Sequence, residues 1–447
     1  MTEPAGGLAR VEAELGRRLP ESHIRPGLER IRQLTDLLGN PQAAYPVVHI
    51  TGTNGKTSTA RMVDALLHSF GLRTGRITSP HLVSPTERIS LDGEPIPAER
   101  FVQTYDDLVP YLKVVDQAQP IPLVYFEVVT AMAFAAFADA PVDVAVVEVG
   151  LGGSWDATNV ADGQVAVVTP VALDHMQYLG DTVDKIAVEK AGIIKPGATA
   201  ILAAQAPEVV PVLLARAAEV GASVAREGLE FGVLDRQVAV GGQQLTLQGL
   251  AGRYGEIFLP LYGAHQARNA AAALAAVEAF FGKGAGTGPL EADLVRAAFA
   301  RVTSPGRLEP VRSAPTVLVD AAHNPHGMTA TAAAVSESFS FRRLVGVVAV
   351  LADKDARGML AVLEPLLDEV VVTQNSSSRR LAADELAAAA VEVFGEDRVT
   401  VELRLDDAIE TAVRLAEGDA GEVAGSGILV TGSVITAGDA RTLLGAR

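Results

Sequence analysis

The segment 48–59, VHITGTNGKTST, constrains the fold of this chain more than any other. It begins with the apolar residues of a short strand and passes through a glycine turn into the start of a helix. Gly52 and Gly55 would let the backbone approach a phosphate group closely, and the N–H groups of the turn would then point into one concavity. The segment therefore predicts a nucleotide phosphate loop between a buried strand and a helix.

The side chains of this loop have the chemistry that phosphate binding requires. Lys56 would supply positive charge, and Thr57 would supply a hydroxyl group that faces a metal ion. The other residues that we expect to contact the nucleotide are Thr53, Asn54, Gly55 and Ser58. The usual phosphate-loop pattern has more residues between its glycines than this loop has. The alternative is a plain strand-to-helix turn with an incidental lysine.

The composition is that of a soluble globular protein. The chain has 447 residues, of which 49% are hydrophobic and 20% charged, so it can form more than one hydrophobic core. Acidic residues outnumber basic ones by 54 to 37, and the net charge of −17 makes nucleic acid and anionic membranes poor partners. The absence of cysteine excludes a disulfide framework, a thiolate zinc site and a thiol nucleophile.

No membrane or secretory segment is expected. Residues 1–18 mix acids and arginines without an apolar run, unlike a secretory signal. The most apolar later stretch, 131–149, is interrupted by charged residues and a proline, so it predicts a helix, a turn and a buried strand rather than a transmembrane helix. We therefore expect a cytoplasmic protein, and we expect it to be a monomer.

Short β-branched runs alternate with helical windows, which is typical of parallel sheets wrapped by helices. The first series of predicted strands is 47–51, 142–149, 165–169 and 198–203. The second is 316–319, 344–350, 369–373, 399–403 and 428–430. They predict an α/β fold with two doubly wound domains, 1–303 and 304–447, of which the second is Rossmann-like. Short alternating segments and glycine turns between residues 231 and 261 predict a small antiparallel insertion in the first domain.

Glu148 is placed for a metal site by the strand that it ends. It ends the run 143–147, which is expected to be buried, and precedes a glycine-rich turn, so we expect its carboxylate at the carboxyl edge of a central parallel strand, where such sheets bind ligands. Mg²⁺ prefers oxygen ligands and completes its octahedron with water and phosphate. Glu148 and Thr57 are therefore the expected magnesium ligands. The alternative is a solvated glutamate at a strand end.

Two further titratable residues follow in the chain. His175 comes shortly after the predicted strand 165–169, and Lys190 lies at the end of an amphipathic helix that begins near Thr182. A lone histidine or lysine in such a place is usually structural or solvated. Spacing alone leaves both interpretations open.

Seven strings of this sequence together resemble the folylpolyglutamate synthase and dihydrofolate synthase family of the Mur ligase superfamily. They are HITGTNGKTST at 49–59, SPHL at 79–82 with ERI at 87–89, EVGLGGSWDATN at 148–159, LDH at 173–175, EKAG at 189–192, GAHQARN at 263–269 and DAAHNP at 320–325. They run in the family's order across nearly the whole chain. The resemblance implies an ATP-dependent ligase that adds L-glutamate to folates, and to dihydropteroate as well, through an acyl phosphate.

The resemblance also implies two magnesium sites. The first is formed by Thr57, Ser79 and Glu148, and the second by Glu148, His175 and Lys190. The family carbamylates this lysine, because carbon dioxide converts a cationic ammonium group into an anionic carbamate whose oxygen atoms can bind the metal. With Lys56, three of these residues, Glu148, His175 and Lys190, form the implied catalytic set. The alternative for Lys190 is an unmodified lysine that the helix dipole favours at a helix end.

The family's contacts to the nucleotide base and ribose map onto Asn269, Arg307, Asp320 and His323. The last three of these lie beyond the predicted domain boundary. Asp320 could instead cap a helix, and His323 could be a core histidine.

The substrate site implied by the resemblance is less complete. It consists of Phe126, Asp156, Thr158 and His81. An aromatic residue at the start of an alanine-rich helix is more often part of the core, which is the alternative for Phe126. Trp155 is not part of the usual motif and could either stack on a ligand or shield the loop.

Two other functions stay open. A Mur-type ligase that builds cell-wall peptides on a UDP-sugar would share TGTNGKT but would lack the SPHL and DATN strings. A phosphate-loop NTPase without ligase activity would hydrolyse ATP without requiring glutamate. The expected partners are small molecules, namely folate or dihydropteroate, L-glutamate and ATP. Arg379 and Arg380 could bind a glutamyl tail or could belong to a solvated loop.

Overall fold

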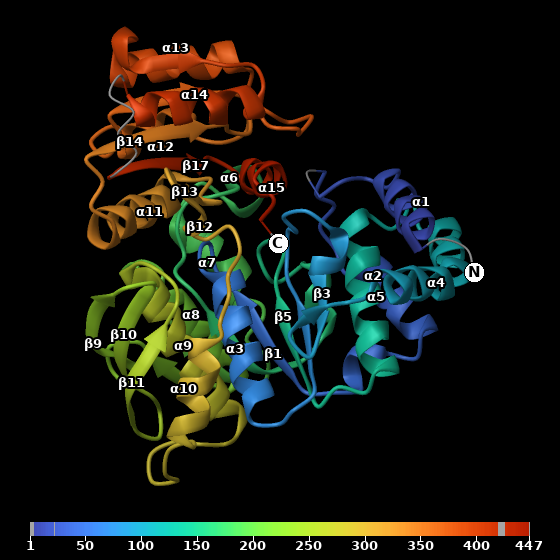
Figure 1. Ribbon diagram of the computed structural model, residues 1–447. Helices are drawn as coiled ribbons and strands as arrows, with labels where there is room; N and C mark the ends of the chain where they lie inside the picture. The colour runs from blue at the N-terminus through green and yellow to red at the C-terminus, as the bar shows by residue number, and fades with distance from the viewer. Residues whose placement is uncertain (1–3, 22, 419–424, 447) are drawn as a thin grey trace. The chain divides into compact units, whose positions relative to one another are not determined.

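The structure is a computed structural model that describes residues 4–21, 23–418 and 425–446. The described chain divides into two compact units, both drawn in Figure 1. The first unit extends to residue 236 and includes 244–259 and 266–302, and the second consists of 237–243, 260–265 and the chain from 303 onwards. The domain boundary that we predict near Ser304 stays a prediction.

The first unit is built on an eight-stranded sheet in the order β4-β3-β2-β5-β1-β6-β7-β8. The six strands β2, β5, β1, β6, β7 and β8 are parallel to one another. Strands β3 and β4 form an antiparallel edge beside β2. The strands are β1 Val47–Thr51, β2 Thr74–Ile77, β3 Ile89–Leu91, β4 Glu94–Pro95, β5 Val144–Glu148, β6 Gly163–Val168, β7 Thr199–Leu202 and β8 Ser223–Arg226. Every residue of the neighbouring strands β1 and β5 is buried, as expected for parallel strands covered on both faces.

Helices pack against this sheet through two apolar clusters. The helices are α1 Pro4–Gly16, α2 Glu29–Leu37, α3 Lys56–Ser69, α4 Ala98–Ala118, α5 Tyr125–Asp139, α6 Met176–Leu179, α7 Val183–Ala191, α8 Val210–Val220, α9 Ala264–Phe280 and α10 Ala292–Ala300, with 3-10 turns η1 Pro41–Ala43, η2 Pro85–Arg88 and η3 Ala157–Val160. One cluster joins α4 and α5 to the sheet, and the other joins α7 and α8 to β6 and β7. Figure 1 shows α3 beside β1 and β5, whose carboxyl ends carry the phosphate loop and Glu148.

The predicted insertion is a three-stranded sheet in the order β11-β10-β9. Its strands are β9 Gly232–Ala239, β10 Gly242–Gln248 and β11 Arg253–Leu259. Val240 and Gly241 alone connect β9 to β10, and so short a connection is possible only between antiparallel strands. The expectation of an antiparallel insertion between residues 231 and 261 is therefore confirmed.

The second unit contains a six-stranded sheet in the order β12-β13-β17-β14-β15-β16. Only β12 is antiparallel to its neighbour. The strands are β12 Glu309–Ser313, β13 Thr316–Val319, β14 Arg343–Val348, β15 Glu369–Val372, β16 Val399–Val401 and β17 Ser426–Thr431; the helices are α11 Pro325–Ser338, α12 Ala356–Leu363, α13 Ala383–Phe394, α14 Leu405–Glu417 and α15 Val434–Leu443, with the 3-10 turn η4 Glu396–Arg398. The unit is a doubly wound α/β structure, as predicted.

Each strand of the two predicted series is present, within a few residues of its expected bounds. The strands that the pattern did not indicate are β2, β3, β4, β8 and β12. Strand β2 has the sequence TGRI, whose glycine and arginine hide it from a hydrophobicity pattern. Tertiary contacts explain both residues. The ring of Phe137 lies 2.6 Å from where a Cβ atom of Gly75 would be, and buried Arg76 pairs with Asp64.

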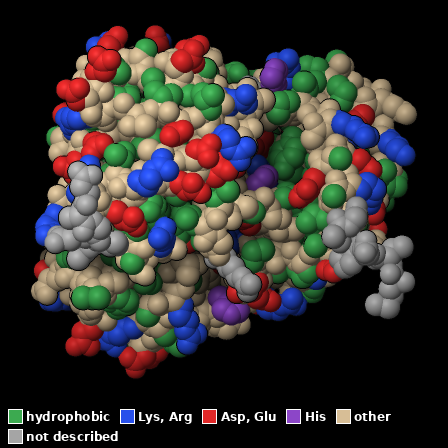
Figure 2. Space-filling view, turned by 45° about the horizontal axis from the view of Figure 1, so that its top comes forward, with side chains coloured by type: hydrophobic (Ala, Val, Ile, Leu, Met, Phe, Trp, Pro, Cys, Tyr) green, Lys and Arg blue, Asp and Glu red, His purple; other side chains and the backbone are tan. Residues whose placement is uncertain are grey.

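Acidic and basic side chains are interspersed on the face shown in Figure 2. None of the helices in the described part of the chain is long and apolar enough to cross a membrane.

Candidate functional site

The phosphate loop has the geometry that its two glycines predict. It joins β1 to α3, and Gly55 precedes the helix with a φ of 92°. At Gly52 the φ is 147°, and a Cβ atom there would lie 1.8 Å from Thr169 Oγ1. At Gly55 a Cβ atom would lie 2.7 Å from Asn269 Oδ1. Both positions therefore require glycine, because a side chain would collide with a neighbouring element.

Helix α9 is bonded to the beginning of α3. Gln266 Nε2 donates to Ser58 Oγ over 3.2 Å, and Asn269 Nδ2 donates to Gln266 Oε1 over 3.1 Å. The structure thus brings together Ser58, Gly55 and Asn269, three residues that the sequence assigned to the nucleotide. Gln266 was not among the predicted residues, although it lies in one of the matching strings.

Glu148 connects the strand β5 to the phosphate loop. It is 1% exposed, so the alternative of a solvated strand-end glutamate is wrong. Its Oε1 accepts a hydrogen bond from Thr57 Oγ1 over 2.8 Å, and its Oε2 accepts one from the backbone N–H of Ser79 over 3.3 Å. A buried carboxylate and a hydroxyl group in contact are hard oxygen donors of the kind that Mg²⁺ binds, so these residues fit the metal.

The described residues contain no group of three histidine, cysteine, aspartate or glutamate side chains that could hold a metal ion. The predicted magnesium ligands are of a different type, because Thr57 and Ser79 are hydroxyl residues and Glu148 is the single carboxylate among them. A site of this type leaves coordination positions for water and phosphate oxygen atoms.

Two lysines share one backbone carbonyl group of the phosphate loop. Lys56 Nζ donates to Gly52 O over 3.1 Å and to Thr53 O over 3.2 Å, while Lys190 Nζ donates to Gly52 O over 2.7 Å. Lys190 is 3% exposed, so it is not a solvated lysine at the end of α7. Burial and then the charge of Lys56 lower the pKa of Lys190 well below its usual range, and Asp174 and Asp156 oppose this shift. A neutral amine is the form that reacts with carbon dioxide.

The segment that leads to His175 is bonded to the same loop. Thr53 N donates to Pro170 O over 3.0 Å, and the hydroxyl group of Thr53 exchanges hydrogen bonds with the backbone N–H and C=O of Ala172. Thr53 therefore braces the loop through these groups. His175 itself adopts a left-handed conformation with a φ of 49° directly before α6, and its backbone N–H donates to Asp174 Oδ1.

The glycine-rich segment 150–159 packs directly on the end of α7. A Cβ atom on Gly153 would lie 2.6 Å from Glu189 O, and one on Gly192 would lie 2.6 Å from Ser154 Cα. Ser154 N donates to Glu189 O, and Asn159 Nδ2 donates to Ser154 O and Gly192 O. This backbone contact fixes the helix end that carries Lys190 relative to the predicted substrate segment.

Asp156 and Thr158 form a buried network with His49 of β1. Asp156 accepts hydrogen bonds from Leu151 N, Thr158 N and the Thr158 hydroxyl group. Because that hydroxyl hydrogen is given to Asp156, His49 Nε2 must donate to Thr158 Oγ1 over their 3.0 Å contact. Burial raises the pKa of Asp156, and these hydrogen bonds oppose the shift. Burial, followed by the charge of Lys195, lowers the pKa of His49 to about 3.

The two aromatic candidates differ in their surroundings. Phe126 lies at the start of α5, and its ring would be 2.6 Å from a Cβ atom on Gly150, so it covers the segment that follows Glu148. Phe126 is also packed against the core cluster of α4 and α5. Trp155 packs with Leu179 in the cluster of α7 and α8, where it shields the glycine segment.

His81 is bound by Arg88, whose Nε donates to His81 Nδ1 over 2.7 Å. Arg88 is a buried arginine that also forms an ion pair with Glu21. Burial and then the Arg88 charge lower the pKa of His81 to about 4, against weaker effects of Glu87 and Glu21. His81 is therefore neutral at ordinary pH.

In the second unit, the carboxylate of Asp320 accepts hydrogen bonds from the loops around it. Asp320 Oδ2 accepts from Leu308 N over 2.8 Å, and its Oδ1 accepts from Ala322 N over 2.9 Å and from Thr331 Oγ1 over 2.8 Å. The cap of α11 is Asn324, so the alternative of Asp320 as a helix cap is wrong.

Arg307 and His323 lie on the two loops that Asp320 joins. Arg307 Nη1 donates to Gly306 O over 3.2 Å, and His323 Nδ1 is 3.0 Å from Ala321 O. His323 is partly exposed and is not a core histidine. Arg379 pairs with Asp353, and Arg380 donates to Ser377 O, both in exposed surroundings that agree with a solvated loop.

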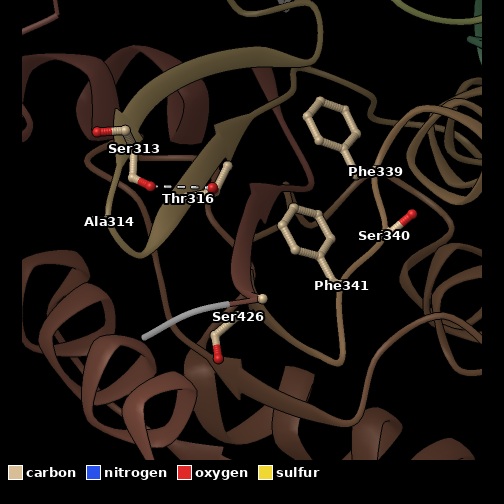
Figure 3. A pocket seen from close by; sticks show the side chains of 8 residues that line it. Ser313, Ala314, Thr316, Phe339, Ser340, Phe341 and Ser426 are labelled. Carbon is tan, nitrogen blue, oxygen red and sulfur yellow. Dashed lines mark hydrogen bonds between the residues drawn. The ribbon is translucent and has the colours of Figure 1, made fainter. Parts of the chain in front are cut away.

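A cavity of about 310 Å³ lies at the end of the second sheet where strands β13 and β17 begin (Figure 3). Its lining includes Thr316 and Ser426, the first residues of β13 and β17, together with Phe339 and Phe341. Asp320 follows the last residue of β13, so the cavity is at the opposite end of this strand. None of the predicted site residues lines it.

Several residues of the site were missed by sequence reasoning. Each of Glu21, His49, Arg88 and Gln266 has a partner far away in the sequence. His49, Arg88 and Gln266 lie within matching strings, but the resemblance assigns no role to them. A buried histidine in an apolar strand and an arginine beside a glutamate were the available signals, and neither specifies a partner.

Two family models match the chain. The model described as "Mur ligase middle domain" matches residues 124–277, and the model described as "Mur ligase, glutamate ligase domain" matches residues 306–434. Together they cover much of both units.

The chain is also similar to named proteins along nearly its whole length. A protein of Mycobacterium tuberculosis named dihydrofolate synthase/folylpolyglutamate synthase is 56% identical over 98% of this chain and 94% of its own. The Escherichia coli protein of the same name is 35% identical over 80% of both chains. A crystal structure of the Mycobacterium tuberculosis folylpolyglutamate synthase complexed with ADP and AMPPCP superposes with a TM-score of 0.95, at 55% identity and with 100% of each chain covered.

Proposed function

The chain belongs to the folylpolyglutamate synthase and dihydrofolate synthase family of Mur ligases, and we propose that its phosphate loop, Glu148 and Lys190 carry out the ligation. It is an ATP-dependent ligase that adds L-glutamate to folates, forming ADP and phosphate. The observation that supports these roles best is the contact of the buried Glu148 carboxylate with Thr57, beside a loop on which two lysines converge.

The first step is activation of the substrate carboxylate. This carboxylate attacks the γ-phosphorus of ATP, ADP leaves, and an acyl phosphate forms. Lys56 is bonded to carbonyl groups of its own loop, and a phosphate oxygen can replace these weak partners. Its charge and the loop N–H groups would then stabilise the negative charge of the transferring group, which is the main requirement of phosphoryl transfer.

The second step forms the amide. The neutral amine of L-glutamate attacks the acyl carbon, the tetrahedral intermediate collapses, and phosphate leaves with the electron pair of the broken C–O bond. The enzyme needs no covalent intermediate of its own, so the contribution of its side chains is to orient the reactants and exclude water.

The residues that would hold magnesium are Thr57, Ser79 and Glu148 at one site and Glu148, His175 and Lys190 at the other. When bound, the metal neutralises charge on the phosphate groups and on the attacking carboxylate. The second site requires Lys190 as a carbamate, because an ammonium group cannot bind a cation. The lowered pKa of Lys190 favours this modification, since it supplies the neutral amine.

The remaining predicted residues would bind the nucleotide and the acyl substrate. Asn269 lies against the phosphate loop, where it can contact the nucleotide. Arg307 and His323 would do so from loops that Asp320 holds in place. Asp156 and Thr158 would contribute to pterin binding by fixing the shape of the segment 150–159, because they form hydrogen bonds within it.

Dihydropteroate is the proposed second acceptor, in agreement with the double name of the relatives. A cytoplasmic location and a monomeric state also stay predictions, which cell fractionation and size-exclusion chromatography would test.

The test of this function uses the purified chain with ATP, magnesium and L-glutamate, and either tetrahydrofolate or dihydropteroate as acceptor. Phosphate release and product mass are measured together. We expect both acceptors to gain glutamate, with phosphate release that depends on glutamate. Phosphate release without any gain in mass would contradict the ligase and favour a plain NTPase, and a gain on one acceptor only would restrict the function to that acceptor.

A further inference from the structure

The segment 79–88 is fixed beside Glu148 by its own residues. Ser79 N donates to Glu148 Oε2 over 3.3 Å, which ties the start of the segment to the predicted metal ligand. The carboxylate of Glu87 accepts from the backbone N–H groups of Leu82, Val83 and Ser84 over 2.9, 2.9 and 2.8 Å. A loop whose N–H groups are bound by one carboxylate has little freedom, so the position of His81 within it is well defined.

Arg88 uses each edge of its guanidinium group. Its Nε–H donates to His81 Nδ1 over 2.7 Å, while Nη1 and Nη2 donate to the two carboxylate oxygen atoms of Glu21 over 2.6 and 3.0 Å. One face of the group lies over the ring of Tyr125, with Cζ 5.1 Å from the ring centroid. The Arg88 side chain is only 4% exposed. A bidentate ion pair combined with a cation–π contact holds its orientation.

This arrangement determines which nitrogen of His81 carries hydrogen. Arginine is always protonated and has no acceptor, so its Nε–H can only donate. His81 Nδ1 must therefore accept, and the single ring hydrogen of the neutral imidazole is on Nε2. The consequence is an N–H donor in a fixed direction, two residues from Ser79.

We propose that Arg88 is a positioning residue that holds His81 as the Nε2–H tautomer, and that this N–H donates a hydrogen bond to an acceptor oxygen of the acyl substrate. The inference deepens the proposed function and rests on it. His81 is connected to the predicted metal ligands through Ser79, and to the predicted pterin contact through Arg88, because Tyr125 directly precedes Phe126. Glu21 and Tyr125 support Arg88 and are positioning residues as well.

Two substitutions of His81 distinguish the role of its Nε2–H donor from the role of its Nδ1 acceptor. His81→Asn keeps an oxygen atom near the position of Nδ1 for Arg88 but loses the distal donor, whereas His81→Gln keeps an N–H group near the position of Nε2. We expect His81→Asn to raise KM for the folate by about tenfold or more, as the loss of a hydrogen bond to a substrate oxygen implies. KM for ATP should stay at its wild-type value. His81→Gln should recover most of the folate affinity, and His68→Asn, an exposed histidine of α3, is the matched control.

The role of Arg88 is measured by nitrogen NMR of protein that contains labelled histidine, with the His81 signal assigned by its loss in His81→Asn. We expect hydrogen on Nε2 in the wild type, and a mixture of both tautomers in Arg88→Lys, whose single nitrogen cannot serve His81 and both oxygen atoms of Glu21. Hydrogen on Nδ1 in the wild type would overturn the role of Arg88, even if Arg88→Lys does not fold.

An unchanged KM for folate in folded His81→Asn, or an equal loss in His81→Gln and His81→Asn, would overturn the donor role of His81. A wild-type protein that adds no glutamate would contradict the proposed function itself. The NMR result does not depend on activity, so the two failures can be distinguished.

Discussion

The phosphate-loop site of the first unit and the Asp320 site of the second unit hold their charged side chains in opposite ways. In the first unit, Lys56 and Lys190 converge on one carbonyl group, and Glu148 contacts Thr57, a second predicted metal ligand. In the second unit, the carboxylate of Asp320 is bound by two backbone N–H groups and a threonine hydroxyl. The difference indicates that the first site keeps reactive groups on partners that a substrate can replace, whereas the second site fixes the shape of a loop.

This comparison predicts different losses on mutation. Removal of a group that stabilises the transferring phosphate should lower kcat without changing stability much. Removal of a brace should lower stability first, and should affect activity through the position of neighbouring residues.

Lys56→Met should cause the largest loss. The variant lacks the charge that stabilises the transferring phosphate, so we expect kcat to fall by a factor of about one hundred to one thousand. Lys185→Met is the matched control, because Lys185 forms only an exposed ion pair with Asp181. Steady-state phosphate release checks both variants, and a kcat for Lys56→Met within a factor of about two of the control would remove Lys56 from the mechanism.

Lys190→Ala should also lose most activity, but short carboxylates should partly restore it. Acetate or formate can occupy the space of the missing carbamate and supply oxygen ligands, and no such rescue is expected for Lys56→Met. The measurement is glutamate-dependent phosphate release over a series of acetate concentrations. Full activity of Lys190→Ala without added carboxylate would contradict the carbamate.

Asp320→Ala tests the second unit. Three donors lose the carboxylate of Asp320, and the Leu308 N–H among them is buried, so we expect a loss of about 1–3 kcal/mol in the free energy of unfolding. KM for ATP should rise because Arg307 and His323 lie on these loops. Urea denaturation and ATP kinetics measure the two effects, with the exposed Asp397→Ala as control. A kcat loss as large as that of Lys56→Met, with unchanged stability, would show that the two units do not differ as described.

The smallest effect concerns His49 in the first unit. Burial lowers its pKa in the folded protein to about 3, from an ordinary value of 6.5, so folding favours the neutral ring. The unfolded chain binds the extra proton between these two values, and stability is therefore lost as pH falls from about 6.5 towards 3. We expect His49→Gln to have a shallower pH dependence of unfolding, by up to about 1.4 kcal/mol per pH unit. Urea denaturation from about pH 7 to pH 5 would test this, and equal slopes would contradict the buried neutral histidine.

The sequence predicted the parts of the site that are continuous in the chain. A strand, a glycine turn and a helix start appear as one string, and Glu148 ends a strand, so the sequence alone predicts a phosphate loop and a carboxylate beside it. Lys190 and His175 could not be placed by spacing, because their surroundings come from other elements. Their suggested roles came from the resemblance to the family.

The supporting contacts could not be predicted, for a physical reason. Gly153 meets the backbone of Glu189, and His49 meets Thr158, across large separations in sequence. Hydrophobic periodicity describes which face of an element is buried and contains no information about such partners. Strand β2 was missed for the same reason, since the partners of its buried arginine, Asp64 and Ser90, belong to other elements.

The central claim is that the substrate carboxylate is activated as an acyl phosphate before glutamate attacks. A folate or dihydropteroate whose reacting carboxylate carries a heavy oxygen isotope tests it directly, with the released phosphate analysed by mass spectrometry after ligation. The account predicts that one labelled oxygen atom is found in the phosphate for each amide formed, because the C–O bond of the acyl phosphate breaks. Phosphate that carries no label, with all remaining label in the folate product and in water, would contradict the account.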